Sequence, residues 1–380
     1  MKKLFYLGVI SLALFEFFNV YFIMLMLGSQ RMNSISLAYF LYSYRWLFRI
    51  SFGLFFLAGA KPAFAQKPKW IPAVVLIASV AIIYFFNFVM SADHMFLQPQ
   101  HVLFRDKSTN QLSDSTLVVS IENNGQVKAY PIRFILYHHQ VQDTIGGKPV
   151  IVTYCNVCHT GRVYEPMVNG KSEKFRLVGM DHFNAMFEDA TTKSWWRQVN
   201  GEAIAGLLKG EVLPEIESTQ MTVKKLFDLY PHAIVMQGDQ ASNSRYDTLG
   251  KFEKGKSKSS LTRTDSRSWQ DKSWVIGIDI NGKSKAYDWN QLKKVRIIND
   301  QIGQQAIVLF LSKDGQSFTA FERPDAETYS ARGDSLVSAL GDYDFSGLSF
   351  KDTTQKLKRI KASQEFWHSW RTFHPATERF

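Results

Sequence analysis

The sequence predicts an α+β protein in which a β-rich, two-lobed soluble region follows a bundle of about three transmembrane helices. Residues 1–95 contain long apolar runs, whereas the chain from about residue 100 onward contains short β-type runs between Gly, Asn and Asp turns. A stretch of this second region also occurs twice at a fixed spacing. With 46% hydrophobic residues among 380, the chain is too apolar to be mostly disordered.

Three apolar runs, at about 4–27, 37–60 and 71–92, define the N-terminal quarter. Each comes close to or exceeds the roughly 20 residues that cross a bilayer. The first run is longer than the core of a cleavable signal peptide, which spans about 7–15 residues. We therefore interpret residues 1–95 as a permanent membrane anchor with three helices.

Two arginines lie inside the second apolar run. Arg45 and Arg49 are four residues apart, so on a helix they share one face. They could form an intramembrane site or a contact with lipid headgroups. We favour snorkelling, or pairing with Glu16, which is the single acidic residue of the first run.

The positions of lysine and arginine predict the orientation of the anchor. Lys2 and Lys3 precede the first run and three lysines lie between the second and third runs, whereas the intervening loop holds only Arg31. Because basic loops stay in the cytoplasm, this pattern places the C-terminal region in the periplasm or exterior of a bacterial inner membrane. The prediction requires residues 37–60 to cross the membrane. If this helix lay flat at the membrane interface, the C-terminal region would be cytoplasmic.

The net charge of +11 does not indicate a nucleic-acid partner. Residues 1–95 carry eight Lys and Arg against two Asp and Glu, so more than half of the excess belongs to the anchor. The remaining residues are nearly balanced in charge. A basic stretch within residues 241–262 is interpreted as a solvated linker.

An internal duplication organises the region after the anchor. The segment beginning at Val118 matches the segment beginning at Val275 with an offset of 157 and no gap. Both contain an Asn-Gly pair, the signal of a tight hairpin turn, and both contain Lys-Ala-Tyr. In each copy we expect a hairpin, a short helix, a turn and a buried strand. The copies define a first lobe at 100–240 and a second at 263–380.

Both cysteines lie in one C-x-x-C motif in the first lobe. A predicted buried strand at 150–154 ends directly at Cys155, and Cys158 and His159 follow. Two thiols at this spacing can close a disulfide or bind one metal, and a nearby His can lower one thiol pKa. The second lobe has no cysteine at the matching positions, so we interpret it as a degenerate repeat.

Four chemistries fit the motif. The first is a thiol–disulfide redox centre in an oxidising compartment. The second is c-type haem, because C-x-x-C-H is its attachment pattern. The third is a metal site using Cys155, Cys158, His159 and His182. A closed zinc site usually needs four protein ligands, and only one C-x-x-C is present here. The fourth is a structural disulfide or two buried thiols in a non-catalytic scaffold. No cofactor is predicted, and metal and haem remain alternatives.

A second dense group of polar and aromatic residues follows the cysteines. Asp181 and His182 lie in a turn-like context and, with His159, could tune a thiol pKa or transfer protons. Four further residues could line a pocket: Asn184, Trp195, Trp196 and Arg197. Each has a simpler explanation as a core or turn residue, and their clustering after the cysteines is what favours a site.

At these motifs the chain resembles the DUF3179 family, bacterial and archaeal proteins of unassigned function. The resemblance covers about residues 100–380 and rests on three segments in the family's order: NGQVKAYP, VTYCNVCHTGRVYEP and GMDHFNAMFEDATTKSWWRQVNGEAIAG. The family usually has proline where this chain has Asn156, and its members commonly lack His159. Some members carry selenocysteine at the cysteine motif. The resemblance therefore implies redox chemistry, argues against haem and supplies no substrate.

The leading hypothesis is a membrane-anchored protein with thiol oxidoreductase-like activity. Either Cys155 or Cys158 attacks and the other resolves. The expected partners are the lipid bilayer and an unidentified protein or small-molecule redox partner.

Overall fold

The structure of this chain is a computed structural model, and it describes residues 1–253, 255–324 and 327–380. Lys254, which belongs to the predicted linker, lies outside the described residues. The chain divides into two compact units. The first comprises Met1–Leu97, Glu173–Arg197 and Glu202–Val212, and the second comprises Gln98–Ser172, Gln198–Gly201 and Leu213–Phe380. The predicted α+β class is confirmed, with apolar helices at the N-terminus and a β-rich remainder.

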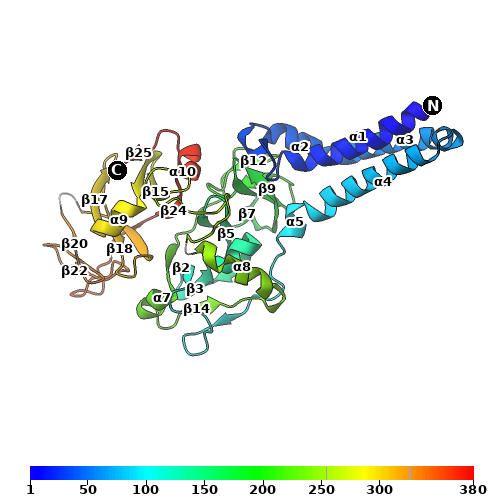
Figure 1. The fold of residues 1–380 in the computed structure, drawn as a ribbon. Coiled ribbons are helices and arrows are strands. Elements are labelled where there is room, and N and C mark those ends of the chain that lie inside the picture. The colour runs from blue at the N-terminus through cyan, green and yellow to red at the C-terminus, as the bar shows by residue number, and fades with distance from the viewer. Residues whose placement is uncertain (254, 325–326) are drawn as a thin grey trace. The chain divides into compact units, whose positions relative to one another are not determined.

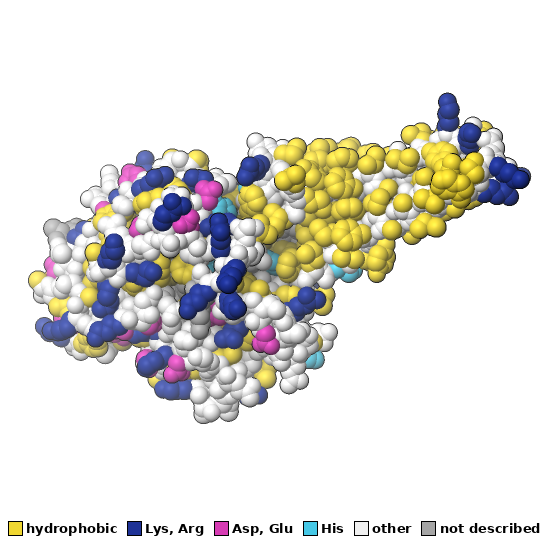
Figure 2. All heavy atoms as spheres, in the orientation of Figure 1, with side chains coloured by type: hydrophobic (Ala, Val, Ile, Leu, Met, Phe, Trp, Pro, Cys, Tyr) yellow, Lys and Arg dark blue, Asp and Glu magenta, His cyan; other side chains and the backbone are white. Residues whose placement is uncertain are grey.

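Three helices of the first unit are long and apolar enough to cross a membrane. They are α1 (Lys2–Tyr21), α3 (Arg45–Ala65), and α4 (Trp70–Tyr84) with its π-helical extension η2 (Phe85–Val89). They run alongside one another (Figure 1), and hydrophobic side chains cover most of their visible surface (Figure 2). The predicted set of three apolar helices is therefore confirmed.

The second predicted helix is wrong in its bounds, because residues 37–60 do not form one helix. The helix breaks at Tyr44, and a short α2 (Ile35–Ser43) precedes α3. Arg45 stabilises the break by donating Nη1 to the Tyr42 carbonyl at 2.6 Å. The first run also stops early, at Tyr21. The chain turns there before the single-turn η1 (Ser29–Arg31), since Ser29 Oγ donates to the Met24 carbonyl.

Helices α1 and α3 approach each other closely because each presents a glycine to its neighbour. A Cβ on Gly8 would lie 2.4 Å from the Phe56 nitrogen, and one on Gly59 would lie 2.1 Å from the Phe5 nitrogen. Small residues at such contacts allow the backbones of membrane helices to pack together. A larger side chain at either position would push the two helices apart.

A buried ion pair links the same helices. Arg49 donates Nε and Nη2 to the Glu16 carboxylate at 2.6 and 2.9 Å. Asn87 bonds both partners, accepting from Arg49 at 2.8 Å and donating to Glu16 at 3.0 Å. The expected pairing with Glu16 is thus confirmed for Arg49, whereas Arg45 bonds the backbone of α2.

The first unit also contains a four-stranded antiparallel sheet in the order β12-β11-β10-β9. Its strands are β9 (Phe175–Asp181), β10 (Asn184–Asp189), β11 (Trp195–Arg197) and β12 (Ala203–Ala205). The sheet meets the chain just after α1, where Met180 donates its N–H to the Ile23 carbonyl at 2.7 Å. Gly179 permits this approach, since a Cβ there would lie 2.2 Å from the same oxygen. A short α5 (Ala92–Met95) follows η2.

In the second unit, the first-lobe segment folds in the predicted order. The hairpin β2 (Leu117–Asn123) and β3 (Gln126–Pro131) is followed by α6 (Ile132–His138), β4 (Gln140–Ile145), β5 (Lys148–Cys155) and β6 (Thr160–Tyr164). The Asn-Gly pair at the hairpin turn adopts positive φ at both residues. The sheets are β1-β14-β3-β2-β13 and β4-β5-β6.

The remaining elements before residue 254 complete this lobe. They are β1 (Phe104–Arg105), β7 (Met167–Val168), β8 (Lys171–Ser172), β13 (Thr219–Thr222), α7 (Val223–Leu229), β14 (Ile234–Met236), η3 (Gln240–Ser242) and α8 (Asn243–Glu253). Helix α8 occupies part of the predicted linker. It packs on α6, where the ring of Tyr246 lies 4.5 Å from that of Phe134.

The second-lobe segment has the same order of elements. These are β15 (Trp274–Ile280), β16 (Lys283–Asp288), α9 (Trp289–Val295), β17 (Ile297–Ile302), β18 (Gln305–Leu311) and β19 (Phe318–Glu322). Further elements are β20 (Ser330–Arg332), β21 (Ser335–Val337), β22 (Asp342–Tyr343), β23 (Arg359–Ile360), β24 (Ser363–Phe366), α10 (Trp367–Phe373) and β25 (Glu378–Arg379). One sheet is ordered β24-β15-β16-β25 and another β17-β18-β19-β23.

A Lys-Tyr-Asp network occurs at matching places in the two segments. Asp143 accepts from Lys128 at 2.8 Å and from the Tyr130 hydroxyl at 2.6 Å. In the second segment an aspartate accepts from a lysine and a tyrosine in the same way, at 2.9 and 2.8 Å: Asp300, Lys285 and Tyr287. In each segment the network ties the hairpin to the strand that follows the helix.

Candidate functional site: a buried pair of thiols

The C-x-x-C motif forms the turn between β5 and β6. Strand β5 ends at Cys155, which pairs with Thr160 at the start of β6. The four residues between them form the turn, and His159 closes it with a φ of 56°. Both thiols of the chain therefore belong to one short turn between two hydrogen-bonded strands.

Both thiols are buried in the second unit. Cys155 is 1% exposed and Cys158 is 0% exposed, and no disulfide joins them. Residues of the second lobe bond the backbone of the turn: Phe366 donates its N–H to the Cys158 carbonyl at 2.8 Å, and His368 Nε2 lies 3.1 Å from the Val157 carbonyl. The second lobe therefore covers the thiol turn of the first.

His159 lies among aromatic rings. Its ring stacks on Trp274 and Phe366 at centroid distances of 4.7 and 5.2 Å, and Phe252 meets it edge-on at 5.0 Å. Its Nδ1 lies 2.8 Å from the Tyr154 hydroxyl. Burial lowers the pKa of His159 to about 3, so the imidazole is neutral at physiological pH. His159 therefore brings no positive charge to the thiols.

Tyr154, next to Cys155 in β5, links the thiol turn to His139, which lies just before β4. Burial and the neighbouring ionisable thiols raise the pKa of Tyr154 well above its ordinary value, so its hydroxyl stays protonated. Its carbonyl lies 2.9 Å from His139 Nδ1, and its N–H donates to the His139 carbonyl at 3.0 Å. Burial lowers the pKa of His139 to about 4. Tyr154, His139 and His159 are thus uncharged hydrogen-bonding groups at the turn.

A buried arginine, which sequence reasoning did not single out, joins the lobes beside this turn. Arg162 in β6 donates Nη2 to Glu365 in β24 at 3.0 Å, and Glu215 lies 3.7 Å from Nη1. Burial opposes the charge of Arg162, but the two carboxylates outweigh it and raise its pKa. The only signal in the sequence was its position four residues after Cys158, within the family-like segment.

A cavity of about 350 Å³ adjoins the turn at Asn156. Its other walls come from α6, through Leu136, from α8, through Leu249 and Phe252, and from the chain around Ser259. Helix α8 and the chain after it therefore lie over one side of the thiol turn.

The second predicted group lies in the first unit, around the turn between β9 and β10. Asp181 accepts from Arg197 Nε and Nη2 at 2.9 and 2.6 Å and lies 2.6 Å from His182 Nδ1. Arg197 also bonds Glu202 at 2.9 Å, and His182 Nε2 lies 3.1 Å from Asn33 Oδ1. The structure thus brings Asp181, His182 and Arg197 together as a charged network.

The other members of this group are buried in the same sheet. Trp195 and Trp196 are 0% and 3% exposed, and each donates its indole N–H to a carboxylate, Glu188 at 3.1 Å and Asp189 at 3.0 Å. Asn184 is fully buried opposite the end of β9. The tryptophans therefore act as core residues with satisfied N–H groups. The cysteine group lies in the second unit and this group in the first.

Metal ligands are not grouped at either place. Within residues 1–253, 255–324 and 327–380, no three His, Cys, Asp or Glu side chains form a cluster that could hold a metal ion. At the thiol turn, His159 is sandwiched between rings, so attachment of a haem would require that packing to open. The observed chemistry at this turn is that of two buried thiols.

Fold and site together define a β-rich protein with apolar N-terminal helices and a pair of buried thiols at the end of a strand. The chain belongs to the DUF3179 family, whose description is "Protein of unknown function", and the match covers residues 98–377. No curated protein and no solved structure matches the chain. The family therefore includes both lobes, and the three apolar helices precede the matched residues.

Proposed function

We propose that this protein is anchored in a membrane by α1, α3 and α4 and exchanges electrons through Cys155 and Cys158. The observation that carries the proposal is that Cys155 ends β5 and Cys158 lies on the four-residue turn that follows it, without a disulfide between them. A turn of this kind brings two thiols within reach of each other. The resemblance to the DUF3179 family, which implies redox chemistry at the cysteine motif, supports the same chemistry.

The proposed reaction is thiol–disulfide exchange with a disulfide of a protein or a small molecule. One thiolate attacks a sulfur of the partner disulfide, forms a mixed disulfide and releases one partner thiolate. The other thiolate then attacks the mixed disulfide, closes the Cys155–Cys158 bond and releases the second partner thiolate. Two electrons pass from the dithiol to the partner, and the two protons pass to solvent or to the released thiolates.

The burial of the thiols means that the reaction requires an opening of the surrounding chain. The cavity beside Asn156 and the cover formed by α8 support opening on that side. His159, held neutral by burial, is proposed to position the turn through Tyr154 rather than to transfer protons. We propose no part in the thiol chemistry for Asp181 and His182, which belong to a polar network of the first unit.

Orientation is a further part of the proposal. Lys2 donates to Gln66 at 2.8 Å, so the basic N-terminus and the lysine-rich chain between α3 and α4 lie at the same end of the bundle. Basic ends remain cytoplasmic, which supports placing the C-terminal region in the periplasm or exterior. Alkaline phosphatase fused after Phe380 is expected to be active. An inactive but well-expressed fusion would reverse the topology.

The test of the redox proposal uses the full chain in lipid nanodiscs. The protein is equilibrated with oxidised or reduced glutathione, quenched with acid, denatured and labelled with a maleimide that shifts its mass. We expect two labels after reduction and none after oxidation, with the fold retained. Cys155→Ser and Cys158→Ser each leave one cysteine. The variant that keeps the attacking cysteine is expected to trap a mixed disulfide with glutathione. In the variant that keeps the resolving cysteine, the remaining thiol is expected to stay unreactive.

One result would contradict redox activity: two labels under every native condition, with disulfide formation only after unfolding. It would favour the second candidate, a non-catalytic scaffold in which the thiols are packing residues. The near-zero exposure of both thiols and the backbone bond of Cys158 to Phe366 of the second lobe favour that candidate. In the scaffold case, each Ser variant would lower stability and leave cellular function intact.

We also propose that the second lobe is a copy of the first that lacks the thiols. The common order of elements, the parallel pairing of β14 with β3 and of β25 with β16, and the matching Lys-Tyr-Asp networks support this. The copy covers the thiol turn through β24 and α10. Its proposed role is to close the site.

A further inference from the structure

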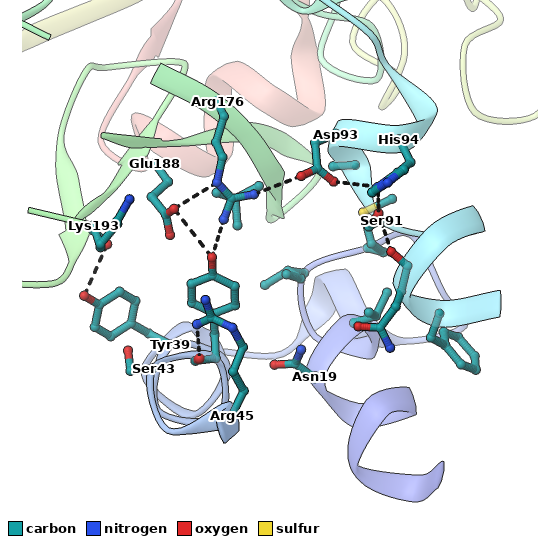
Figure 3. A pocket seen from close by; sticks show the side chains of 18 of the residues that line it. Asn19, Tyr39, Ser43, Arg45, Ser91, Asp93, His94, Arg176, Glu188 and Lys193 are labelled. Atoms are coloured by element: carbon teal, nitrogen blue, oxygen red, sulfur yellow. Dashed lines mark hydrogen bonds and ion pairs between the residues drawn. The ribbon is translucent and has the colours of Figure 1, made fainter. Parts of the chain in front are cut away.

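A cavity of about 560 Å³ lies in the first unit, where the apolar helices end. Its wall comes from the last turns of α1, the end of α2, the first turns of α3 and the strands β9 and β10 (Figure 3). Part of this wall is apolar: Val20, Ile23, Met24, Phe86 and Val178. The cavity thus joins apolar and polar surface at the level where the chain leaves the proposed bilayer.

Two cations of the cavity are neutralised by the protein itself. Arg49 forms its ion pair with Glu16 between the helices. Arg176 donates to Glu188 at 2.9 Å and to Asp93 at 3.3 Å (Figure 3). These arginines therefore hold the walls together.

Two other cations, Arg45 and Lys193, line the cavity. Arg45 bonds the Tyr42 carbonyl and lies 3.9 Å from the centre of the Tyr42 ring, and the Lys193 side chain is exposed. Among the described residues, no carboxylate lies within ion-pair distance of Arg45 or Lys193. The cavity therefore carries a net positive charge, because Glu188 and Asp93 together offset Arg176 and only one further cation.

Asn19 adds a buried amide to the same wall. Its side chain is 8% exposed, and its Oδ1 has no hydrogen-bond partner among the residues that the structure describes. Buried acceptors are nearly always paired, so an unpaired one that lines a cavity points to a ligand that donates. The site thus requires an anionic group and a hydrogen-bond donor in one molecule.

We propose that this junction cavity binds a membrane phospholipid with an anionic, hydroxyl-bearing headgroup such as phosphatidylglycerol. Arg45 and Lys193 bind the phosphate through charge-assisted hydrogen bonds, and a headgroup hydroxyl donates to Asn19. The apolar wall receives the first part of an acyl chain. The inference rests on the membrane anchoring proposed above and is independent of the thiol chemistry.

The test counts lipids bound to the full chain by native mass spectrometry after exchange with vesicles of phosphatidylglycerol or of phosphatidylcholine. One phosphatidylglycerol is expected to remain, with an affinity about tenfold above that of phosphatidylcholine. Arg45→Gln combined with Lys193→Gln should abolish the preference. The matched control, Arg31→Gln with Lys209→Gln, removes two exposed cations of the same unit outside the cavity and should retain it. Equal behaviour of the two double variants overturns the proposal.

Two further arms separate the sources of phosphate and the role of Asn19. Glycerol phosphate added in solution should not displace the lipid. If it does, the ligand of the cavity is a soluble phosphate and not a lipid. Asn19→Leu should remove the preference for phosphatidylglycerol over phosphatidylmethanol, which lacks the hydroxyl. Lys193→Gln alone, at an exposed position, keeps the test valid if the double variant misfolds. If alkaline treatment extracts the wild type from membranes, the proposed anchoring is wrong. If a variant stays in the membrane but loses the bound lipid, the result concerns only the cavity.

Discussion

The turn after β5 and the turn after β18 occupy matching places in the two lobes but are held by different chemistry. In the second lobe, the carboxylate of Asp314 accepts from the N–H groups of Gln316 and Ser317 at 2.9 and 2.8 Å, so bonds within the turn help to hold it. In the first lobe, the turn carries two thiols and is held by aromatic rings and backbone bonds from the other lobe. The printed side-chain and backbone bonds of the thiol turn to the other lobe come from β24 and α10, whereas its counterpart combines bonds within the turn with bonds from Thr222 of the first lobe.

This difference has a functional consequence. The thiol turn would lose its backbone bonds from Phe366 and His368 if β24 and α10 moved away, whereas the bonds from Asp314 within the second-lobe turn would remain. Any process that loosens the contact between lobes is thus expected to raise the reactivity of Cys155 and Cys158.

Phe366→Ala should have the largest effect, because it removes a fully buried ring that stacks on His159. A Phe→Ala change in a core costs about 3–5 kcal/mol, and here the cavity opens beside the thiols. We expect a lower denaturation midpoint and faster alkylation of the cysteines under native conditions. Phe318→Ala is the matched control, since Phe318 is 2% exposed in the core of the second lobe. Equal alkylation rates in the two variants at equal stability would contradict the coupling.

Arg162→Met tests the polar contact between the lobes. The substitution leaves Glu365 buried at 0% exposure without its cation, and breaking a buried pair in this way costs about 3–5 kcal/mol. The unfolding free energy of the full chain in detergent measures it. Adding Glu365→Leu should restore part of the loss, because the unpaired charge is then removed. A double variant as unstable as Arg162→Met would show that the charge is not the cause.

The pH dependence of stability offers a smaller and more specific test. The pKa of His159 is about 3 in the folded chain and about 6.5 in its ordinary state, so between these values the unfolded chain binds a proton that the folded chain does not. Stability is therefore full above pH 6.5 and falls as the pH drops, by about 1.4 kcal/mol per unit for one such histidine. His139 adds a similar decrease down to about pH 4.

His159→Phe should remove one of these two contributions. Unfolding measured at pH 7.5 and pH 5 is expected to show a smaller loss in the variant than in the wild type, while the aromatic stack is kept. The comparison is internal to the molecule, since the matching residue of the second lobe, Gln316, does not titrate. An unchanged slope would mean that His159 is protonated in the folded chain.

Local sequence signals were sufficient for the elements but not for the surroundings of the thiols. The Asn-Gly pairs and the apolar run before Cys155 predicted the hairpins and the strand, because turn chemistry and burial patterns act over a few residues. The stack of Trp274 and Phe366 on His159 joins residues more than 100 positions apart, so no local pattern contains it. The break at Tyr44 was not predicted because apolar residues continue on both sides of Ser43, Tyr44 and Arg45.

Asp314→Ala should produce the smallest and most local effect. It removes a carboxylate that accepts hydrogen bonds from two backbone N–H groups of the second-lobe turn, a loss comparable to that of a helix cap, about 1 kcal/mol. Because none of these bonds involves the thiol turn, we expect the alkylation rate of Cys155 and Cys158 to stay at the wild-type value. Thr222 also donates to Asp314 at 3.0 Å, so a modest loosening of α7 is expected in hydrogen exchange. A rise in cysteine reactivity would show that the second-lobe turn supports the thiol site, and that the two turns are not independent.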